Sequence, residues 1–334
     1  MADANWAADC GLPIVFGPVK SRRLGWSLGI NNVRPKTCTY SCVYCQVGAT
    51  TRARVQREAS YGPSSVASAV KERVEQCRQA RQPIDYATFV PDGEPTLDAA
   101  LGSSIQAVQA MGLRVAVITN GSLLWREDVR DELGGADWVS LKIDTVDEHT
   151  WRRLNRPVRG LDLTVILEGM RRFAEEFHGY VATETMLVAG VNDDAPSIER
   201  VARFVRSLEP SHAYISVPTR PATEAWVREP SGDMAARAAE LLARTGLPTT
   251  LLRSDEDESG FATAPDAVEG LVGILAVHPM TETAARDYAE RSDVDWSVIQ
   301  KSIDAGRIVR TSHDGVEYLR LASPRPETTL PDGR

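Results

Sequence analysis

The stretch Cys38-Thr39-Tyr40-Ser41-Cys42-Val43-Tyr44-Cys45 places three cysteines within eight positions of the chain. Three thiolates at this spacing can hold three irons of a four-iron cluster, which leaves one iron open. An open iron can coordinate a small molecule and pass an electron to it, whereas a cluster with four cysteine ligands only stores or relays electrons. The spacing therefore predicts a redox enzyme.

Two other interpretations of the cysteine triplet fit the sequence less well. A zinc site would need a fourth ligand, such as a distant histidine, and structural zinc sites usually show paired Cys-x-x-Cys units. Three close thiols without a metal would be prone to oxidation. The chain has five cysteines, an odd number that argues against a disulfide framework. We interpret the other two, Cys10 and Cys77, as buried or incidental thiols.

The pattern Cys-x3-Cys-x2-Cys, with the aromatic Tyr44 before its last cysteine, resembles the radical S-adenosylmethionine (SAM) superfamily. The resemblance implies that Cys38, Cys42 and Cys45 bind a [4Fe-4S] cluster, whose remaining iron chelates the amino and carboxylate groups of SAM. It also implies that the reduced cluster cleaves SAM to methionine and a 5'-deoxyadenosyl radical, which removes a hydrogen atom from the substrate. An external one-electron donor of the flavodoxin or ferredoxin type is then expected. No catalytic side chain is identified.

Short β-rich runs alternate with longer helical patterns between about residues 26 and 252, which predicts repeated βα units and a parallel sheet. The predicted strands are residues 27–33, 86–90, 114–119, 138–143, 181–188 and 212–217. The predicted helices are residues 64–80, 97–111, 163–177, 195–207 and 234–243. Six such units imply an α/β fold, a partial (βα)6 parallel barrel of the radical SAM type.

The loops that follow the strands carry function in parallel α/β folds. After the second strand, Asp92-Gly93-Glu94-Pro95 is similar to the Gly-Gly-Glu-Pro segment that binds the amino group of SAM in the superfamily, with Asp92 in place of the first glycine. Gly93 would allow close backbone approach, and Pro95 would bias Glu94 toward an extended conformation. A carboxylate beside an ammonium group is favourable. Taken alone, the tetrapeptide is equally compatible with a tight turn.

Further cofactor-site residues are expected on the next three strands. Thr119-Asn120-Gly121 resembles a strand-end turn near the cofactor, although Asn-Gly is by itself a turn signal. Ser140, Lys142 and Asp144 share one face of the fourth strand, which indicates either a lined cavity or a solvated edge. The resemblance implies that the fifth strand and the loop after it contact the ribose or adenine of SAM. The cofactor-binding residues expected in all are Tyr44, Asp92, Gly93, Glu94, Asn120, Ser140, Lys142, Glu184 and Asn192.

Ten arginines fall in segments near the expected mouth of the barrel. They are Arg22, Arg23, Arg52, Arg54, Arg57, Arg152, Arg153, Arg156, Arg159 and Arg220. Such a rim suits an anionic substrate, either a phosphate-bearing small molecule or RNA, because guanidinium groups bind phosphate through two parallel hydrogen bonds. The alternative is that these arginines are ordinary solvated residues. The net charge of -8 argues against a protein that coats nucleic acid indiscriminately.

The last part of the chain differs in composition from the predicted barrel, residues 1–252. Residues 253–264 are acidic and polar, which predicts a linker, and residues 323–334 are expected to be disordered. Residues 265–322 contain predicted helices at 267–277, 281–291 and 295–305 and a hairpin turning at Asp314-Gly315, a pattern that resembles a winged-helix module. This module has six basic and ten acidic residues, so DNA is not an expected partner.

Residues 21–25 and 151–157, taken with the cysteine triplet, look most like the branch of the superfamily that includes the tRNA wyosine-base synthases. The expected function is therefore a radical SAM enzyme that acts on a nucleotide or a tRNA base. The alternatives are a radical SAM enzyme acting on a protein or small metabolite, and a non-catalytic iron-sulfur sensor. No segment reaches 18 consecutive apolar residues and no basic and apolar leader is recognised, so a cytoplasmic protein without a membrane partner is expected.

Overall fold

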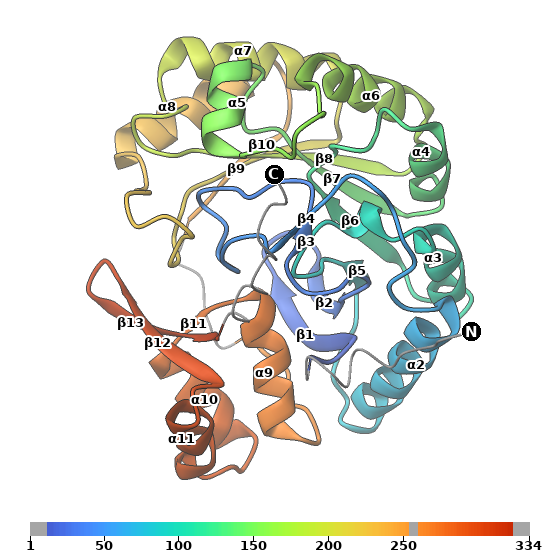
Figure 1. Cartoon of the computed structure of the whole chain (residues 1–334), viewed down its shortest axis with the longest axis vertical. Helices are drawn as coiled ribbons and strands as arrows, with labels where there is room; N and C mark the ends of the chain where they lie inside the picture. Colours follow the sequence, from blue (N-terminus) through green and yellow to red (C-terminus); the bar gives the residue numbers. More distant parts are fainter. Residues whose placement is uncertain (1–11, 254–259, 323–334) are drawn as a thin grey trace, which may run out of the picture.

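The computed structural model describes residues 12–253 and 260–322, and these form a curled sheet with helices on its outer side (Figure 1). Its strands are β1 (Val15–Ser21), β2 (Gly25–Ile30), β5 (Tyr86–Phe89), β6 (Val115–Thr119), β7 (Trp138–Lys142), β8 (Tyr180–Met186), β9 (His212–Ser216) and β10 (Thr249–Leu252). The strand order is β1-β2-β5-β6-β7-β8-β9-β10. Only β1 and β2 are antiparallel within this sheet. The predicted α/β partial barrel is confirmed, with eight strands in its sheet.

Helices between the strands cover the outer side of the sheet. They are α2 (Pro63–Gln79), α3 (Leu101–Gln109), α4 (Glu127–Leu133), α5 (Glu148–Leu154), α6 (Leu163–Glu176), α7 (Ala195–Ser207) and α8 (Gly232–Ala243). In α6, Ile166, Met170 and Phe173 recur at intervals of three or four residues and pack in the main core. The helix begins at Asp162, whose side chain accepts a hydrogen bond from the backbone N–H of Val165 at 3.1 Å.

The elements missing from the sequence prediction are short or carry residues that usually interrupt them. The strand β1 contains Gly17-Pro18, which reads as a strand breaker, and β10 has only four residues. The helices α4 and α5 have only seven residues each, and α4 is mostly charged. The helix predicted over residues 97–111 is present as α3, but its predicted start is wrong, because a 3₁₀ turn, η1 (Pro95–Leu97), is followed by an extended Asp98 before α3 begins.

The C-terminal unit, which we define as residues 261–322, lies beside β1 (Figure 1). Its elements are α9 (Ala267–Val277), β11 (Met280–Thr281), α10 (Glu282–Arg291), α11 (Trp296–Asp304), β12 (Ile308–His313) and β13 (Val316–Leu321). The three strands form an antiparallel sheet in the order β11-β13-β12. The three helices and the hairpin lie where they were expected, while the winged-helix assignment stays a prediction. The disordered tail and residues 254–259 of the linker lie outside the described residues.

One apolar core joins the C-terminal unit to the barrel. Leu12 and Phe16 belong to the same buried cluster as Leu271 and its neighbours in α9. A Cβ atom added to Gly273 of α9 would come within 2.8 Å of Pro13 and 3.2 Å of Phe16. The helix therefore lies directly against the beginning of β1, and the absence of a side chain at this glycine permits the close approach.

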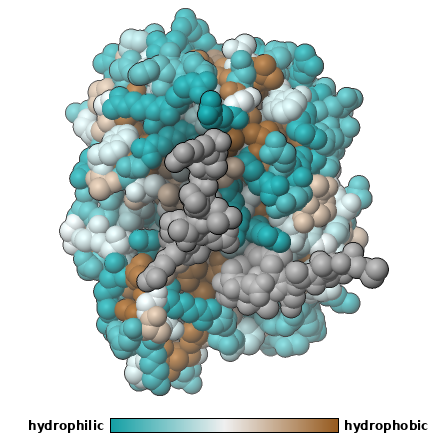
Figure 2. Space-filling model, viewed as in Figure 1, coloured by the Kyte–Doolittle hydropathy of each residue, from teal (hydrophilic) through white to brown (hydrophobic). Residues whose placement is uncertain are grey.

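The main core lies between the sheet and the helices that cover it. Leu28, Phe89 and Leu141 are fully buried there. The face of the molecule seen in Figure 2 is mostly hydrophilic, with apolar side chains near its centre and over the C-terminal unit. In the part of the chain that the structure describes, the helices are too short or too polar to cross a membrane.

Candidate active-site cavity

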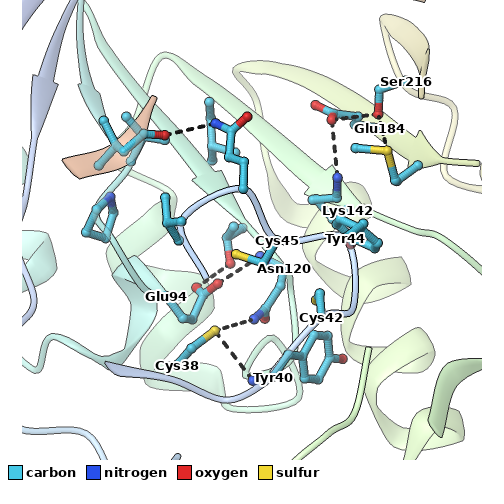
Figure 3. A pocket seen from close by; sticks show the side chains of 18 of the residues that line it. Cys38, Tyr40, Cys42, Tyr44, Cys45, Glu94, Asn120, Lys142, Glu184 and Ser216 are labelled. Atoms are coloured by element: carbon cyan, nitrogen blue, oxygen red, sulfur yellow. Dashed lines mark hydrogen bonds and ion pairs between the residues drawn. The ribbon is translucent and has the colours of Figure 1, made fainter. Parts of the chain in front are cut away.

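The three cysteines lie on a loop, the cysteine loop, that starts at β3 (Thr37–Cys38) and leads to β4 (Arg52–Ala53). Strands β3 and β4 pair with each other in a parallel arrangement. Within the loop, the backbone N–H of Val43 donates to the backbone oxygen of Leu154 at 2.9 Å, which ties the loop to the end of α5. All three thiols line one cavity, and Figure 3 shows their positions around it.

The cavity has a volume of about 840 Å³, which lies within the range of about 300–1,000 Å³ found for ligand sites. It is lined by the cysteine loop, by residues at the carboxyl ends of β5 to β9, and by the C-terminal unit. This position agrees with the strand-end rule for parallel α/β folds. The predicted cofactor-site residues that line it are Tyr44, Asp92, Gly93, Glu94, Asn120, Lys142 and Glu184.

The thiols of the cysteine loop are partly buried, and two of them accept hydrogen bonds from nitrogen donors. Cys38 Sγ accepts from Tyr40 N at 3.4 Å and from Asn120 Nδ2 at 3.6 Å. Cys42 Sγ accepts from Asn155 Nδ2 at 3.5 Å. Burial raises the pKa of all three thiols, that of Cys42 to about 12, so forming thiolates at neutral pH requires a positive charge at the site. Nitrogen donors to sulfur and a need for positive charge both fit an iron-sulfur cluster.

A single metal ion requires a more convergent set of donors than the cysteine loop offers. Within residues 12–253 and 260–322, no three His, Cys, Asp or Glu side chains converge to hold one metal ion. In a four-iron cluster held by three cysteines, each thiolate binds a different iron, so such a cluster needs ligands around it rather than ligands converging on one point.

Glu94 connects two segments that the sequence presents as separate motifs. Its Oε1 accepts hydrogen bonds from Thr96 N at 3.1 Å and from the hydroxyls of Thr96 and Thr119 at 2.6 Å each. Its Oε2 accepts from Asn120 N at 2.8 Å. Burial raises the pKa of this carboxyl, and the hydrogen bonds oppose the shift. The carboxylate therefore fixes the loop that carries Asn120, which in turn donates to a cysteine sulfur.

Asp92 and Gly93 lie beside the cysteine loop. A Cβ atom at Gly93 would come within 2.2 Å of the backbone oxygen of Thr37, so glycine is required for this contact. Asp92 Oδ2 forms a buried ion pair with Lys36 Nζ at 3.0 Å, while its Oδ1 is buried without a hydrogen-bond partner among the described residues. Burial raises the pKa of Asp92 although the Lys36 ammonium opposes the shift. The unpartnered oxygen is an acceptor that fits a donor such as the ammonium group of SAM.

A buried group of charged side chains lies on another side of the cavity (Figure 3). Glu184 forms ion pairs with Arg23 and with Lys142, the latter at 3.2 Å, and accepts a hydrogen bond from Ser216 Oγ at 3.0 Å. Burial alone would raise the pKa of Glu184, but the charges of Arg23 and Lys142 outweigh it and lower the pKa below its usual range. The Lys142 ammonium also lies 4.9 Å from the ring centre of Tyr44.

Asp144 links the cysteine loop to the barrel strands. Its Oδ2 accepts hydrogen bonds from the Tyr44 hydroxyl and from Asn155 Nδ2, the latter at 2.7 Å. Its Oδ1 accepts from Met186 N at 2.9 Å. Asp144 and Lys142 both line the cavity, so the polar face at the end of β7 is a cavity wall and not a solvated edge.

Two of the predicted cofactor-binding residues, Ser140 and Asn192, do not line the cavity. Ser140 is fully buried further from the carboxyl end of β7, and its hydroxyl has no hydrogen-bond partner within the described ranges. Asn192 Nδ2 donates to the backbone oxygens of Asp144 and Met186 at 2.9 and 2.8 Å, and its Oδ1 accepts from Val188 N at 2.8 Å. The side chain of Asn192 thus holds the loop after β8 in place.

The arginines predicted to form a rim have different surroundings. Arg22, Arg23 and Arg220 line the cavity. The side chain of Arg57 is only 6% exposed, donates to the backbone oxygens of Thr96 and Asp98 at 2.8 Å each, and pairs with two acidic residues of α4. Three others form ion pairs, namely Arg54 with Glu58, Arg152 with Glu148 and Arg156 with Glu224. The cationic part of the cavity wall is therefore narrower than the predicted rim.

The C-terminal unit closes one side of the cavity. Gln46, next to Cys45, donates from Nε2 to the backbone oxygen of Val277 at 2.9 Å. Phe261, Val277 and His278 line the cavity. Nothing in the sequence marks His278, a single histidine after a helix, and no spacing relates it to the cysteines more than 230 residues earlier.

Comparisons with known proteins agree with this fold and site. The model of the radical SAM superfamily matches residues 33–205, a segment that contains the cysteine loop. The chain belongs to the radical SAM superfamily. A solved structure with the same fold is a radical SAM methyltransferase from Sphaerobacter thermophilus, with a TM-score of 0.55 and 19% identity over 69% of this chain and 67% of that chain.

Similarity in sequence identifies individual relatives within and near the superfamily. The UPF0026 protein of Methanocaldococcus jannaschii is 37% identical over 316 residues, which cover 94% of this chain and 98% of that protein. The S-adenosylmethionine-dependent nucleotide dehydratase of a Thermoplasmatales archaeon is 38% identical over 56 residues, or 17% of this chain and 20% of that protein.

Membership of the superfamily confirms the predicted family and shows that the protein is a radical SAM enzyme. The superfamily implies SAM and an iron-sulfur cluster as cofactors. The narrower assignment to the branch of the wyosine-base synthases stays a prediction, as do the electron donor and the cytoplasmic location.

Proposed function

We propose that Cys38, Cys42 and Cys45 hold a [4Fe-4S] cluster, that SAM binds beside it in the same cavity, and that the protein removes a hydrogen atom from a nucleotide-like, phosphate-bearing substrate. The observation that carries this proposal is the placement of the three partly buried thiols on the wall of one cavity of about 840 Å³. When bound and reduced, the cluster would supply the electron that cleaves SAM.

The protein's own residues would position the cofactors. Asn120 and Asn155 donate to the sulfurs of Cys38 and Cys42, which favours the thiolate form and fixes the side-chain directions. The unpartnered oxygen of Asp92 would accept a hydrogen bond from the ammonium group of SAM. These contacts bring the cofactor groups to the end of the cavity formed by the cysteine loop.

The charges that line the cavity support an anionic substrate. Its basic residues are Lys20, Arg22, Arg23, Lys36, Lys142 and Arg220, and its acidic residues are Asp92, Glu94, Asp144 and Glu184. Each of the four acids accepts hydrogen bonds or forms ion pairs within the described chain. The basic excess favours a phosphate-bearing ligand. The short similarity to a nucleotide dehydratase supports a nucleotide in particular.

The test is cofactor content and SAM cleavage by the anaerobically reconstituted protein. We expect about four irons per chain, and formation of 5'-deoxyadenosine after addition of dithionite. Replacing all three cysteines of the loop by alanine should abolish both. Cys77→Ala is the matched control, because Cys77 is buried in α2 and does not line the cavity. Iron retained by the triple variant, or no 5'-deoxyadenosine from the intact protein, would contradict the proposal.

The substrate class is tested by adding nucleotides, RNA or peptide fractions to the same reaction. A phosphate-bearing nucleotide should increase the rate of 5'-deoxyadenosine formation, because a bound hydrogen donor commits SAM cleavage to product. Transfer of deuterium from a labelled nucleotide into 5'-deoxyadenosine would identify the donor directly. Stimulation by peptides alone would show that the substrate is a protein and not a nucleotide.

A further inference from the structure

A second hollow of the surface, which we call the arginine groove, lies between α6 and α7 on the helical side of the barrel (Figure 1). It is open to solvent and has a volume of about 340 Å³. Three of the six residues that line it are arginines and none is acidic, which makes it locally basic on a protein of net charge -8. The lining residues are Val146, Leu167, Arg171, Arg200, Arg203 and Phe204.

The three arginines are brought together around one aromatic ring. The Cζ atom of Arg171 on α6 lies 4.9 Å from the ring centre of Phe204 on α7. Phe204 directly follows Arg203 and lies one helical turn after Arg200, and residues three or four positions apart on a helix are neighbours on its surface. The buried ring and Leu167 therefore form an apolar floor, and the guanidinium groups stand around it.

Most donors of these guanidinium groups have no partner within residues 12–253 and 260–322. Arg203 forms no hydrogen bond or ion pair there, Arg171 only stacks on the ring, and Arg200 donates one hydrogen bond of 3.0 Å to a serine hydroxyl. A guanidinium has five N–H donors. Asp147 and Asp194 interact electrostatically with Arg200, but each is the N-cap of its own helix and does not line the groove. The groove therefore has spare donors and an uncompensated charge.

The arginine groove adjoins the active-site cavity. Leu167 lines both of them. At the end of β7, Thr145 lines the cavity and the next residue, Val146, lines the groove. Leu167 and Arg200 also lie in the first halves of α6 and α7, on the side of the barrel where the parallel strands end. A long ligand with one group in the cavity can therefore also contact the groove.

The chemistry of the groove fits the backbone of RNA. Guanidinium groups bind phosphates through paired hydrogen bonds, so several arginines without a nearby acid suit a chain of phosphates. A nucleotide must be unpaired to enter the cavity, and the loops of RNA offer unpaired nucleotides with a phosphate on each side. In duplex DNA the same entry would require flipping a base out of the helix, at a cost in free energy.

We propose that Arg171, Arg200 and Arg203 bind backbone phosphates of a single-stranded RNA segment, one nucleotide of which enters the active-site cavity. This inference rests on the proposed function and narrows its substrate from a phosphate-bearing nucleotide to a nucleotide within RNA. The contacts would position the RNA without reading its bases.

The test measures binding of a short, fluorescently labelled single-stranded RNA to the full chain by anisotropy at several salt concentrations. For single strands, each phosphate contact adds about 0.7 to the slope of log affinity against log salt, which is about fivefold in affinity at 0.1 M salt relative to 1 M. The double variant R200Q/R203Q should therefore lower the slope by about 1.4 and the affinity at 0.1 M salt by about 25-fold. Both arginines are exposed, so the variant should fold, and its Tm checks this.

Arg206→Gln is the matched control. Arg206 is exposed on the same helix, three residues after Arg203, but does not line the groove. It should leave the slope and the affinity for RNA unchanged. No RNA binding by the intact chain, or equal slopes for R200Q/R203Q and R206Q, would overturn the proposal.

Other ligands separate RNA from the alternatives. A nucleoside 5'-monophosphate has no flanking phosphates, so R200Q/R203Q should bind it as the wild type does, and a loss of its binding would contradict a site for the RNA backbone. Tighter binding of the same sequence as single-stranded DNA would assign the groove to DNA. If the variant binds RNA normally but binds reduced flavodoxin more weakly, the groove is a docking site for an acidic protein and the proposal is wrong.

These measurements need neither the cluster nor SAM, so their failure would leave the proposed radical chemistry standing. Conversely, a chain that binds RNA through the groove but does not cleave SAM would contradict the proposed function alone.

Discussion

Replacing Glu184 by glutamine should destabilise the protein, because it leaves two buried cations without their counter-charge. Glu184 pairs with Arg23 and Lys142, and these side chains are between 11% and 20% exposed. Breaking a buried ion pair from one side costs about 3–5 kcal/mol. Glutamine keeps the shape and can accept the hydrogen bond from Ser216, so we expect the lower end, about 3 kcal/mol. For a chain of this length, that corresponds to a fall in Tm of about 4 °C.

The loss of stability in E184Q should become smaller as the pH falls. The pKa of Glu184 is lowered in the folded protein, so its stabilisation is complete above the pKa of the unfolded chain, about 4.3, and disappears as the pH falls toward the lower folded value. The difference in Tm between the wild type and E184Q should therefore be constant from about pH 6 to 8 and shrink below about pH 4. Scanning calorimetry over this pH range measures it.

The matched control is Glu240→Gln, which removes the same charge from an exposed pair. Glu240 and Arg244 are 62% and 66% exposed and lie one helical turn apart. This change should alter Tm by less than about 1 °C, because exposed pairs contribute little. If E184Q is no more destabilising than E240Q, or if its effect does not shrink in acid, the buried cluster does not stabilise the fold as argued.

Three further predictions follow from single contacts. Gly93→Ala should lower Tm by several degrees, because its Cβ would lie 2.2 Å from a backbone oxygen. Gly62→Ala is the control and should change Tm little, because the nearest atom to its Cβ would be 3.7 Å away. Thermal denaturation of both variants measures the difference. Asn155→Ala removes a donor to Cys42 Sγ and should make the reduction potential of the proposed cluster more negative, and an unchanged potential in an anaerobic redox titration would count against this role. Arg57→Met should cost about 3 kcal/mol in urea unfolding, since it leaves two backbone oxygens unpaired. A loss below about 1 kcal/mol would show that water replaces these bonds.

Local patterns explain why much of the fold was predictable. The spacing of apolar residues along the chain predicts the alternation of strands and helices, and the spacing of the three cysteines identifies the cysteine loop. The strand β1, which the sequence did not predict, shows a limit of such patterns. Gly17-Pro18 reads as an interruption, yet the antiparallel pairing with β2 accommodates it through an irregular register between Phe16 and Val19. The chain's local signals are thus reliable for regular elements and poor for edge strands.

The roles of individual side chains depend on partners far away in the sequence. Arg57 was expected at the cavity mouth, but the acidic residues of α4 and two backbone oxygens hold it elsewhere. Asn192 was expected at the cofactor, but its amide bonds the backbone of its own loop and of Asp144 after β7. His278 reaches the cavity only because an apolar core docks the C-terminal unit on β1. Residue type and spacing do not encode these distant contacts.

The bond from Gln46 to Val277 joins residues 231 positions apart, and it has a consequence for how the protein is made. A ribosome releases the amino end first, so the nascent chain exposes its cysteines long before α9 exists. During that interval one wall of the cavity is missing and the thiols are open to oxidants. Insertion of iron and sulfide is therefore best timed after translation has ended, and anaerobic growth should raise the yield of intact protein.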